Sequence, residues 1–350
     1  MSQIFKKVSR EDVARYAGVD RATVSIVLNN TRPTSEETRR RVLNAVKKLN
    51  YVPDSAARTM KTNESYQLAI IVDNILDPMF SELIAHFEGL AMQNGYFVNI
   101  CGGYGTFEQY ITHLIARHID GIFLAINLSK VSKEAIKQLL DNNIRICMGG
   151  WDREYYGDKV TFINVDVETG FRFHMNHLKS LGHKKAAYLS CFLPDDPLDI
   201  RARTYYKVHR EVFDCEGFLF CGRSYVTPTI EHGAEMGAQM LAQDSSITAI
   251  ICANDSMAVG VIKMLKSKQL NCPNDVSVLG INNDVRSKLA EPEITTFGAD
   301  YSEFARNILQ DLIGKNGGGN NLIVPIRHYI RQSTGFARKG EIGRKEKSSI

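Results

Sequence analysis

The stretch VSREDVARYAGVDRATVSIVLNN, from Val8 to Asn30, decides how the rest of the chain is interpreted. Apolar residues recur at helical spacing on both sides of Gly18: Val13, Ala14 and Ala17 before it, and Ala22, Val24, Val27 and Leu28 after it. Two short helices joined at a glycine are the layout of a helix-turn-helix. The sequence around this stretch decides whether it is one.

Local start signals indicate three helices in this region. Ser9 followed by Asp12 approximates a capping box for the first helix, and Asp20 can cap the second. Thr34 with Glu37 forms a capping box for a third helix, SEETRRRVLNAVKKLN. The apolar stripe of that helix consists of Val42, Ala45, Val46 and Leu49. Three short helices with so few apolar residues predict a small head domain with a marginal core.

A short hinge follows in YVPDSAARTMKTNES, residues 51–65. Pro53 ends the third helix, because the residue before a proline is disfavoured in the α region. Asp54 or Ser55 can then cap one turn of helix, AARTM. A single turn is unstable alone, so we expect it to form only against a partner or a nucleic acid. The head is therefore expected to span residues 1–50, with the hinge and linker after it.

The charge of the chain is distributed unevenly. Residues 1–61 hold 13 Lys and Arg against 6 Asp and Glu, whereas the remainder holds 30 against 33. A basic head on a mildly acidic body indicates a polyanionic partner for the head alone. A solvated basic face without a partner is the alternative that charge leaves open.

Length and composition restrict the class of protein. A chain of 350 residues, 44% hydrophobic and 23% charged, is expected to form two or three globular domains. It has no apolar run of about 18 residues, and MSQIFKKVSRED lacks the apolar region of a secretion signal. Its seven cysteines form no C-x-x-C pair, which favours reduced thiols over disulfides or a zinc ribbon. We therefore expect a cytoplasmic protein that does not enter a membrane.

The head resembles the DNA-binding head of the LacI/GalR family of bacterial transcription regulators. The resemblance is carried by VSREDVARYAGVDRATVSIVLNN, RPTSEETRRRVLNAVKKLNYVP and SAARTM, which follow the family's order and spacing. It implies that the second helix, from about Asp20 to Asn29, enters the major groove of a double-stranded DNA operator. It also implies that the hinge folds on DNA.

The resemblance implies roles for residues of the second helix. Arg21 and Ala22 stand at its exposed start, where Arg21 could bind guanine through two hydrogen bonds and Ala22 could contact a thymine methyl group. Ile26 replaces an arginine of many members, so the operator should differ at that position. Short polar groups suited to phosphate oxygens are Ser9, Thr23, Ser25 and Asn29. The alternative for Thr23 and Ser25 is a helix-surface hydroxyl that bonds its own backbone.

In the hinge, Met60 takes the place of a leucine that the family inserts as a wedge into a minor-groove step. Methionine is apolar and of similar length, so we expect the kink to survive with a looser fit. Ala57 is small enough for two hinge helices to approach each other. Arg58 and Lys61 flank it for phosphate contacts.

From Tyr66 onward, short apolar β-type runs alternate with helical stretches, as in QLAIIVDN, MFSELIAHFEGLAMQNG, YFVNICGG, FEQYITHLIARHID and GIFLAIN. This alternation predicts an α/β fold with parallel sheets covered on both faces. The number of strand–helix units favours two similar lobes. The segment EIGRKEKSSI after Gly340 is expected to be part of a disordered tail. The expected boundaries are about 66–166 and 297–324 for lobe 1, about 167–296 and 325–337 for lobe 2, and 338–350 for the tail.

The body resembles the LacI/GalR regulatory core, which has the type I periplasmic-binding-protein fold. The matching motifs, in order, include DPMF, IDGIFL, LGHKKAAYL, ICANDSMAVGV, CPNDVSVLGIN, ITTF and IRQSTG. Ligands of such sheets bind outside the carboxyl ends of the strands. The resemblance implies an effector site with these residues: Asp77, Phe80, Trp151, Asp199, Arg203, Asn254 and Asn282.

Two departures from the family bear on the effector. Asn282 stands where the family has a carboxylate, and Gly150 replaces an aspartate that is frequent before Trp151. The strand-end amides, acids, aromatic rings and arginine as a whole suit a hydroxyl-rich molecule, so we expect a sugar or a sugar derivative. The loss of two carboxylates would suit an anionic or less hydroxylated ligand, such as a sugar phosphate. The alternative is that polar residues at strand ends, such as Asp255 and Asp284, only cap the helices that follow.

Head and body together predict a ligand-responsive transcription regulator that acts as a repressor. It is expected to bind a near-palindromic operator as a homodimer. A solute-binding protein of a transport system is the alternative. An enzyme is not expected, because the sequence has no Walker A loop, G-x-S-x-G, H-E-x-x-H or glycine fingerprint after the first strand. No cofactor is expected either. His174 and His177 lie three residues apart without a third ligand, which favours a packed pair over a zinc site.

Overall fold

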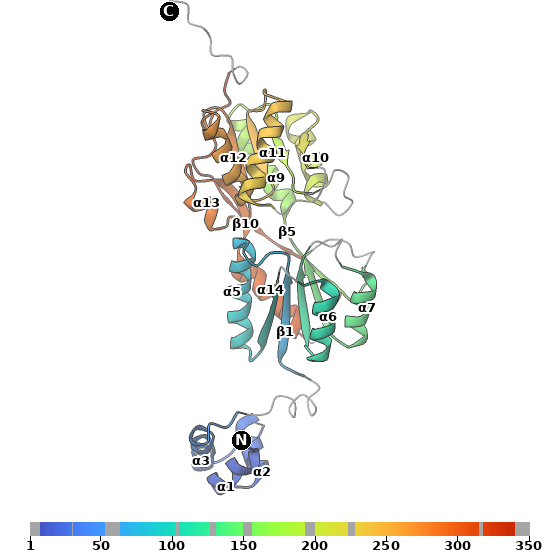
Figure 1. Cartoon of the computed structure of the whole chain (residues 1–350), viewed down its shortest axis with the longest axis vertical. Coiled ribbons are helices and arrows are strands. Elements are labelled where there is room, and N and C mark those ends of the chain that lie inside the picture. The colour runs from blue at the N-terminus through green and yellow to red at the C-terminus, as the bar shows by residue number, and fades with distance from the viewer. Residues whose placement is uncertain are drawn as a thin grey trace, which may run out of the picture. The chain divides into compact units, whose positions relative to one another are not determined.

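The computed structural model describes residues 8–29, 31–52, 64–102, 105–126, 131–149, 156–192, 200–222, 228–314 and 318–339 (Figure 1). The chain divides into two compact units, Met1–Ser65 and Tyr66–Ile350. Six residues with predicted roles lie outside the described residues: Ala57, Arg58, Met60 and Lys61 of the hinge, and Trp151 and Asp199 of the effector site. No helix among the described residues is long and apolar enough to cross a membrane.

Between residues 8 and 52, where the structure describes all but residue 30, the head forms helices α1 (Arg10–Ala17), α2 (Arg21–Asn29) and α3 (Glu36–Lys48). The predicted capping box of Ser9 and Asp12 is confirmed at α1. Asp20 caps α2, since its Oδ1 accepts a hydrogen bond from the Thr23 amide at 2.6 Å. The prediction for α3 was wrong by one residue, because Ser35 is its N-cap and accepts from the Thr38 amide.

Apart from Tyr51, the core of the head consists of valine and alanine side chains. Its buried members are Val13, Ala14, Ala17, Val24, Val27, Val42, Ala45 and Tyr51, with Val46 and Leu49 packed against them. Tyr51 is only 7% exposed, so the folded head continues one residue past the predicted boundary at 50. A core of valines and alanines buries little apolar area, so the stability of the head is expected to be modest.

The first six-stranded sheet forms lobe 1, and its strands are all parallel in the order β11-β5-β4-β3-β1-β2. The strands are β1 (Gln67–Val72), β2 (Phe97–Gly102), β3 (Gly121–Ala125), β4 (Arg145–Gly149), β5 (Thr161–Val165) and β11 (Asn321–Val324). Helices α5 (Pro78–Gln93) and α14 (Tyr301–Ile313) pack on one face. Helices α6 (Phe107–Ala116) and α7 (Lys133–Asp141) pack on the other.

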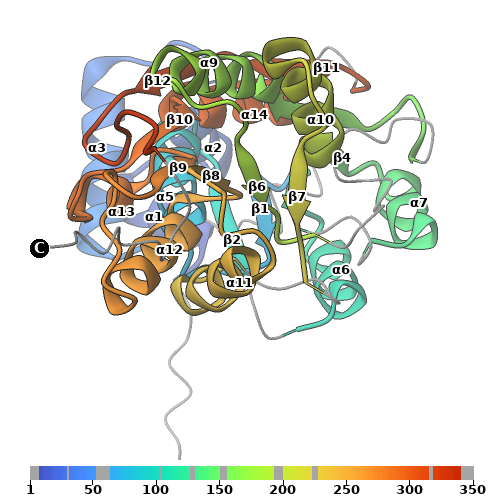
Figure 2. The same ribbon diagram turned by 90° about the horizontal axis from the view of Figure 1, so that it is seen from above.

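The second six-stranded sheet forms lobe 2 in the order β12-β10-β9-β8-β6-β7, and only β12 is antiparallel. The strands are β6 (Ala187–Leu189), β7 (Phe218–Phe220), β8 (Ala249–Cys252), β9 (Ser277–Ile281), β10 (Thr295–Ala299) and β12 (Ile326–Tyr329). Its helices are α9 (Val167–Ser180), α10 (Ile200–Phe213), α11 (Ile230–Gln243), α12 (Asp255–Ser267) and α13 (Val285–Leu289). Helices α9 and α10 lie on one side of this sheet and α11 and α12 on the other (Figure 2).

The chain passes between the lobes three times. The first crossing follows Val165, the last residue of β5, and the third follows Val324, the last residue of β11. The second crossing lies at Asp300 and not at 297, because β10 pairs with β12 through Ala299. The predicted tail also begins too early, since Arg338 donates hydrogen bonds to the carbonyl oxygens of Ser245 and Ile247.

Candidate functional site

The start of α2 presents the residues expected to read DNA bases. Arg21 and Ala22 are exposed on its first turn, directly after the capping residue Asp20, and Ile26 one turn later is half-buried. The hydrogen bonds from the Thr23 amide and hydroxyl lower the pKa of Asp20, so the cap is a carboxylate at neutral pH. The Asp20 cap therefore fixes the first turn of α2, while the side chains of Arg21 and Ala22 point outward without a hydrogen bond to any described residue of the head.

The short polar residues of the head are engaged with one another. Thr23 Oγ1 donates to Asp20 at 3.0 Å, and Asn29 Nδ2 donates to Ser25 Oγ at 3.3 Å. Ser9 Oγ donates to Asp12 at 2.6 Å. These bonds join side chains to one another, so they are not the hydroxyl-to-backbone bonds of the alternative. Phosphate contacts by Ser9, Thr23, Ser25 and Asn29 remain a proposal.

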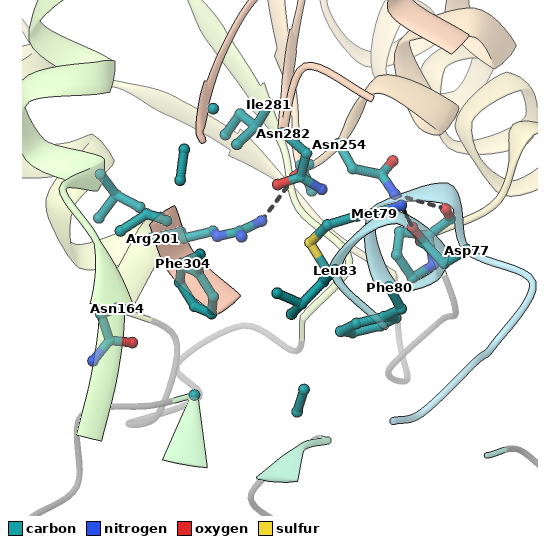
Figure 3. A pocket seen from close by; sticks show the side chains of 18 of the residues that line it. Asp77, Met79, Phe80, Leu83, Asn164, Arg201, Asn254, Ile281, Asn282 and Phe304 are labelled. Atoms are coloured by element: carbon teal, nitrogen blue, oxygen red, sulfur yellow. Dashed lines mark hydrogen bonds between the residues drawn. The ribbon is translucent and has the colours of Figure 1, made fainter. Parts of the chain in front are cut away.

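A cavity of about 320 Å³ lies in the core unit at the carboxyl ends of strands from both lobes (Figure 3). Its size is within the range of small-molecule sites. Lobe 1 contributes mainly apolar side chains, among them Met79, Phe80, Leu83, Phe123, Ile126 and Phe304. The polar side chains in its lining include Asp73, Asn74, Asp77, Asn164, Arg201, Asn254, Asn282 and Tyr301. Four of the predicted effector residues, Asp77, Phe80, Asn254 and Asn282, are brought together here.

Among the described residues, the arginine that lines the cavity is Arg201, and the predicted effector arginine, Arg203, does not line it. Arg201 lines the cavity and its Nη1 donates to the Ala253 carbonyl oxygen at 2.9 Å. Arg203 is exposed and is absent from the lining. Two residues along a helix turn a side chain by roughly 200°, so only one of the two can face the cavity.

The two predicted asparagines differ in what they can offer a ligand. Asn254 caps α12, since its Oδ1 accepts from the Met257 amide at 2.8 Å and its Nδ2 donates to the Pro228 carbonyl oxygen at 3.0 Å. The side chain of Asn282 has no such bonds among the described residues, and it projects into the cavity in Figure 3. Asn254 therefore shapes the cavity wall, whereas Asn282 can bind a ligand.

The backbone at Asn282 is held in an unusual conformation. Asn282 and Asn283 have φ angles of 105° and 56°, in the left-handed region that side chains rarely adopt. The Asn282 carbonyl oxygen accepts a hydrogen bond from Tyr301 Oη at 2.7 Å, which joins lobe 2 to α14 of lobe 1. Burial raises the pKa of Tyr301 well above its usual range, so this hydroxyl stays a donor. Strained residues of this kind cluster at ligand sites.

Asp77 is both a helix cap and a cavity residue. Its Oδ1 accepts from the Met79 amide at 2.9 Å, which fixes the start of α5. Burial raises the pKa of Asp77 above its ordinary value. Phe80, one residue after Met79, contributes a ring to the cavity wall in Figure 3.

The prediction from sequence did not include several residues that line the cavity. Met79 and Leu83 lie on the same face of α5 as Phe80, so the helical spacing from DPMF could have found them. Phe304 lies on α14, one turn after the second crossing. No local signal points to it, because it depends on the chain returning to lobe 1.

Two buried carboxyl groups, Asp255 and Asp284, follow the lining residues Asn254 and Asn282 in sequence. The Asp284 amide donates to Asp255 Oδ2 at 2.8 Å, and Asp284 caps α13. The capping alternative is thus correct for Asp284 and wrong for Asp255, because Asn254 caps α12. Burial and the neighbouring carboxyl of Asp284 raise the pKa of Asp255. Burial, with the nearby charge of Asp77, raises the pKa of Asp284 to about 6.

The shift at Asp284 predicts a pH-dependent stability. Its folded pKa of about 6 exceeds the ordinary 3.8, so the folded core loses stability as pH rises between these values. Asp284→Asn keeps the cap but cannot ionise. It is expected to stabilise the core by up to about 3 kcal/mol at pH 7.5 and by little at pH 4. Thermal unfolding at both pH values measures this, and an equal shift at both would rule out ionisation of Asp284 as the cause.

His174 and His177 are packed and bonded within lobe 2. His174 is fully buried and its Nε2 lies 3.0 Å from the Gly280 carbonyl oxygen, while His177 Nε2 lies 2.9 Å from Thr334 Oγ1. Burial lowers the pKa of His174 to about 3, so its ring is neutral. Within the ranges that the structure describes, no group of three or more His, Cys, Asp and Glu is placed to hold a metal ion.

Comparison with known proteins identifies the two parts. Residues 11–54 match the family model of bacterial regulatory proteins, lacI family, and residues 175–334 match that of a periplasmic binding protein-like domain. The HTH-type transcriptional repressor PurR of Mannheimia succiniciproducens is 31% identical over 306 residues, which cover 86% of this chain and 89% of the relative. The chain belongs to the LacI family of bacterial regulatory proteins.

Other LacI-family proteins are similar over nearly the full length. PurR of Histophilus somni (strain 2336) is 29% identical over 320 residues, covering 89% of this chain and 94% of that protein. The lac repressor dimer bound to operator and the anti-inducer ONPF has a TM-score of 0.78 at 23% identity, over 94% of this chain and 100% of that one. A LacI-family regulator of Enterococcus faecium with bound ribose has a TM-score of 0.66 at 22% identity, over 78% and 100%. At these identities the solved structures support the fold.

Membership of the LacI family makes the chain a DNA-binding transcription regulator with a ligand-binding core. The match over the head favours this function over the transport alternative that the sequence left open.

Proposed function

We propose that this LacI-family regulator is a ligand-responsive repressor that binds a near-palindromic operator as a homodimer. The observation that carries the proposal is a cavity lined by both lobes in a chain whose head exposes Arg21 and Ala22 on the first turn of α2. The similar PurR proteins are named as transcriptional repressors. Each head would read one half-site, with half-sites about one helical turn apart.

The effector we propose is a sugar or a sugar derivative. Amide, carboxyl and guanidinium groups of the lining can bond hydroxyls, and the rings of Phe80 and Phe304 can cover the apolar face of a sugar ring. Proteins of similar fold were solved with ribose, glucose and lactose bound. The apolar majority of the lining favours a derivative that carries an apolar group over a free sugar with hydroxyls on every side.

Exposed apolar side chains support the homodimer. Large apolar residues that solvent reaches in the single chain include Leu76 (76%), Phe97 (60%) and Leu289 (78%), with Met92, Ile100 and Val285 also exposed. They lie at the start and end of α5, on the edge strand β2 and on α13. Exposed apolar surface of this kind commonly marks an interface. A sedimentation measurement should return about twice the chain mass of 39.3 kDa.

The effector would act by changing the angle between the lobes. The Tyr301–Asn282 hydrogen bond joins the lobes beside the cavity, and α13 follows Asn282 after two residues. A ligand that contacts Asn282 can therefore move α13, which carries Val285 and Leu289 of the proposed dimer surface. By linkage, an effector that prefers the state off DNA must weaken operator binding by the same factor.

Selection from a library of genomic fragments tests this function. The purified protein is incubated with the library while a panel of sugars and sugar derivatives is added or omitted. We expect one palindromic sequence to be enriched, and its enrichment to change with one compound. Enrichment of no sequence under any condition, with normal binding of a small molecule by the core, would contradict the proposal.

The assignment of Arg201 to the effector site is tested by replacing Arg201 and Arg203 separately with alanine. Arg201→Ala is expected to abolish the response to the compound found in that selection while operator affinity without it changes less than twofold. Loss of a charged hydrogen-bond donor costs roughly 1.5–3 kcal/mol, which corresponds to a ten- to hundredfold weaker effector. Arg203→Ala is the matched control, because it removes the same charge from the exposed side of α10. A lost response in Arg203→Ala and a normal one in Arg201→Ala would reverse the assignment.

A further inference from the structure

One arginine of α3 holds the turn of the helix-turn-helix. Arg41 Nε donates to the Ala17 carbonyl oxygen at 2.9 Å, and its Nη2 donates to the same oxygen at 2.5 Å. Nη2 also donates to the Gly18 carbonyl oxygen at 2.7 Å. The guanidinium therefore binds both carbonyl groups at the point where the chain leaves α1 for α2.

Gly18 leaves the space that this guanidinium occupies. Its φ of 62° lies in the left-handed region, and a β-carbon added to it would come 2.7 Å from Arg41 Nη2. The glycine thus permits both the tight turn and the approach of the arginine. In this head the turn glycine and Arg41 form one unit, although they are 23 residues apart in sequence.

The position of α2 depends on this turn. The last carbonyl groups of a helix have no partner within the helix and carry its partial negative charge, so a cation bound there is favourable. Only two side chains of α2, Val24 and Val27, are buried in the apolar core of the head. Such small side chains fix the angle of a nine-residue helix weakly, so a charged clamp at its entry has a large share in setting its direction.

We infer that Arg41 is a positioning residue for operator recognition, which orients α2 by clamping the Ala17 and Gly18 carbonyl groups and makes no DNA contact of its own. The inference rests on the proposed reading of DNA by α2. The neighbouring Arg40 is exposed on the same helix and forms no such clamp. It carries the same charge, and this makes it the matched control.

Positioning and phosphate binding have different signatures on DNA. An arginine bound to a phosphate weakens specific and non-specific binding alike when it is removed, and reduces the slope of log affinity against log salt by about one. A positioning residue affects base contacts, so its removal weakens only specific binding. The salt slope then stays as it was.

The experiment compares Arg41→Ala, Arg41→Lys and Arg40→Ala in the full-length protein. Each binds two duplexes over a salt series: the sequence that the wild-type protein selects and a scrambled duplex of equal length. We expect Arg41→Ala to weaken the selected duplex roughly tenfold or more and the scrambled one less than twofold, with an unchanged salt slope for the selected duplex. Arg41→Lys keeps the charge but not the two-pronged geometry, so it should resemble Arg41→Ala. Arg40→Ala should leave the ratio of the two affinities unchanged.

Hydrogen exchange of the free proteins supplies a test that needs no operator. Amides of residues 15–24 should exchange several-fold faster in Arg41→Ala and Arg41→Lys than in Arg40→Ala or the wild type. Equal weakening on both duplexes with a reduced salt slope would overturn the inference in favour of a phosphate contact. Unchanged exchange at the turn would overturn it as well, even if the wild-type protein selected no sequence. If Arg41→Ala unfolded the head, amides throughout α1–α3 would exchange fast. The exchange of residues 15–24 in Arg41→Lys would then test the inference.

Discussion

Replacing Arg21 with alanine is expected to remove most of the sequence discrimination of the protein. Arg21 is exposed on the first turn of α2, next to the bonded cap of Asp20, so its side chain is free to reach a base edge. A bidentate arginine–guanine contact contributes about 1–3 kcal/mol, and a dimer loses two of them. The selected operator should therefore bind about 30-fold more weakly or worse, as measured by fluorescence anisotropy.

The same change should barely affect DNA of random sequence. Two positive charges are lost per dimer, which weakens non-specific binding only by a modest, salt-dependent factor. Arg40→Ala removes the same charge from α3 and serves as the control. If Arg21→Ala and Arg40→Ala lost affinity equally for selected and random duplexes, Arg21 would be a phosphate contact and not a base reader.

Adding one methyl group at Gly260 is expected to destabilise lobe 2 severely. Helices α11 and α12 approach closely there, and a β-carbon on Gly260 would lie 2.0 Å from the Ile230 carbonyl oxygen and 2.7 Å from the Ala234 amide nitrogen. Both neighbours are backbone atoms, so the helices must separate. Overpacking of this kind costs about 3 kcal/mol or more.

The substitution Gly89→Ala is expected to stabilise the core unit, in contrast to Gly260→Ala. Gly89 lies within α5, and a β-carbon there would meet nothing within 4 Å. Alanine should stabilise the core by about 0.5–1 kcal/mol, because glycine loses more conformational freedom in a helix. Calorimetry of both variants measures the contrast. A Gly260→Ala core as stable as the wild type would mean that the α11–α12 contact is looser than described.

The head could be predicted from sequence because its signals are local. The cap at Ser9, the turn at Gly18 and the apolar stripe of α3 each depend on residues within one or two turns of one another. The prediction failed by one residue at Thr34 because Ser35 and Thr34 are both good caps, and the choice depends on the exact helix start. Arg41 was missed because its partners lie in another helix.

The cavity was only partly predictable for a related reason. The resemblance to the family supplied Asp77 and Asn282, and both lie in segments that follow strands, β1 and β9. The choice between Arg201 and Arg203 depends on the rotational phase of α10, which no periodic signal fixes at the first turn of a helix. Residue type alone could not show that the amide of Asn254 is already bonded on both sides while that of Asn282 is not.

The most direct test of the account is a titration of the selected operator against a version in which one half-site is scrambled. Each duplex is titrated by anisotropy with the full-length protein, with and without the compound from the selection. We expect the scrambled half-site to lower affinity by at least a hundredfold, and the compound to shift the affinity of the intact palindrome in the wild type but not in Arg201→Ala. Equal affinity for both duplexes, or the same shift in Arg201→Ala, would contradict a dimeric regulator controlled from the interlobe cavity.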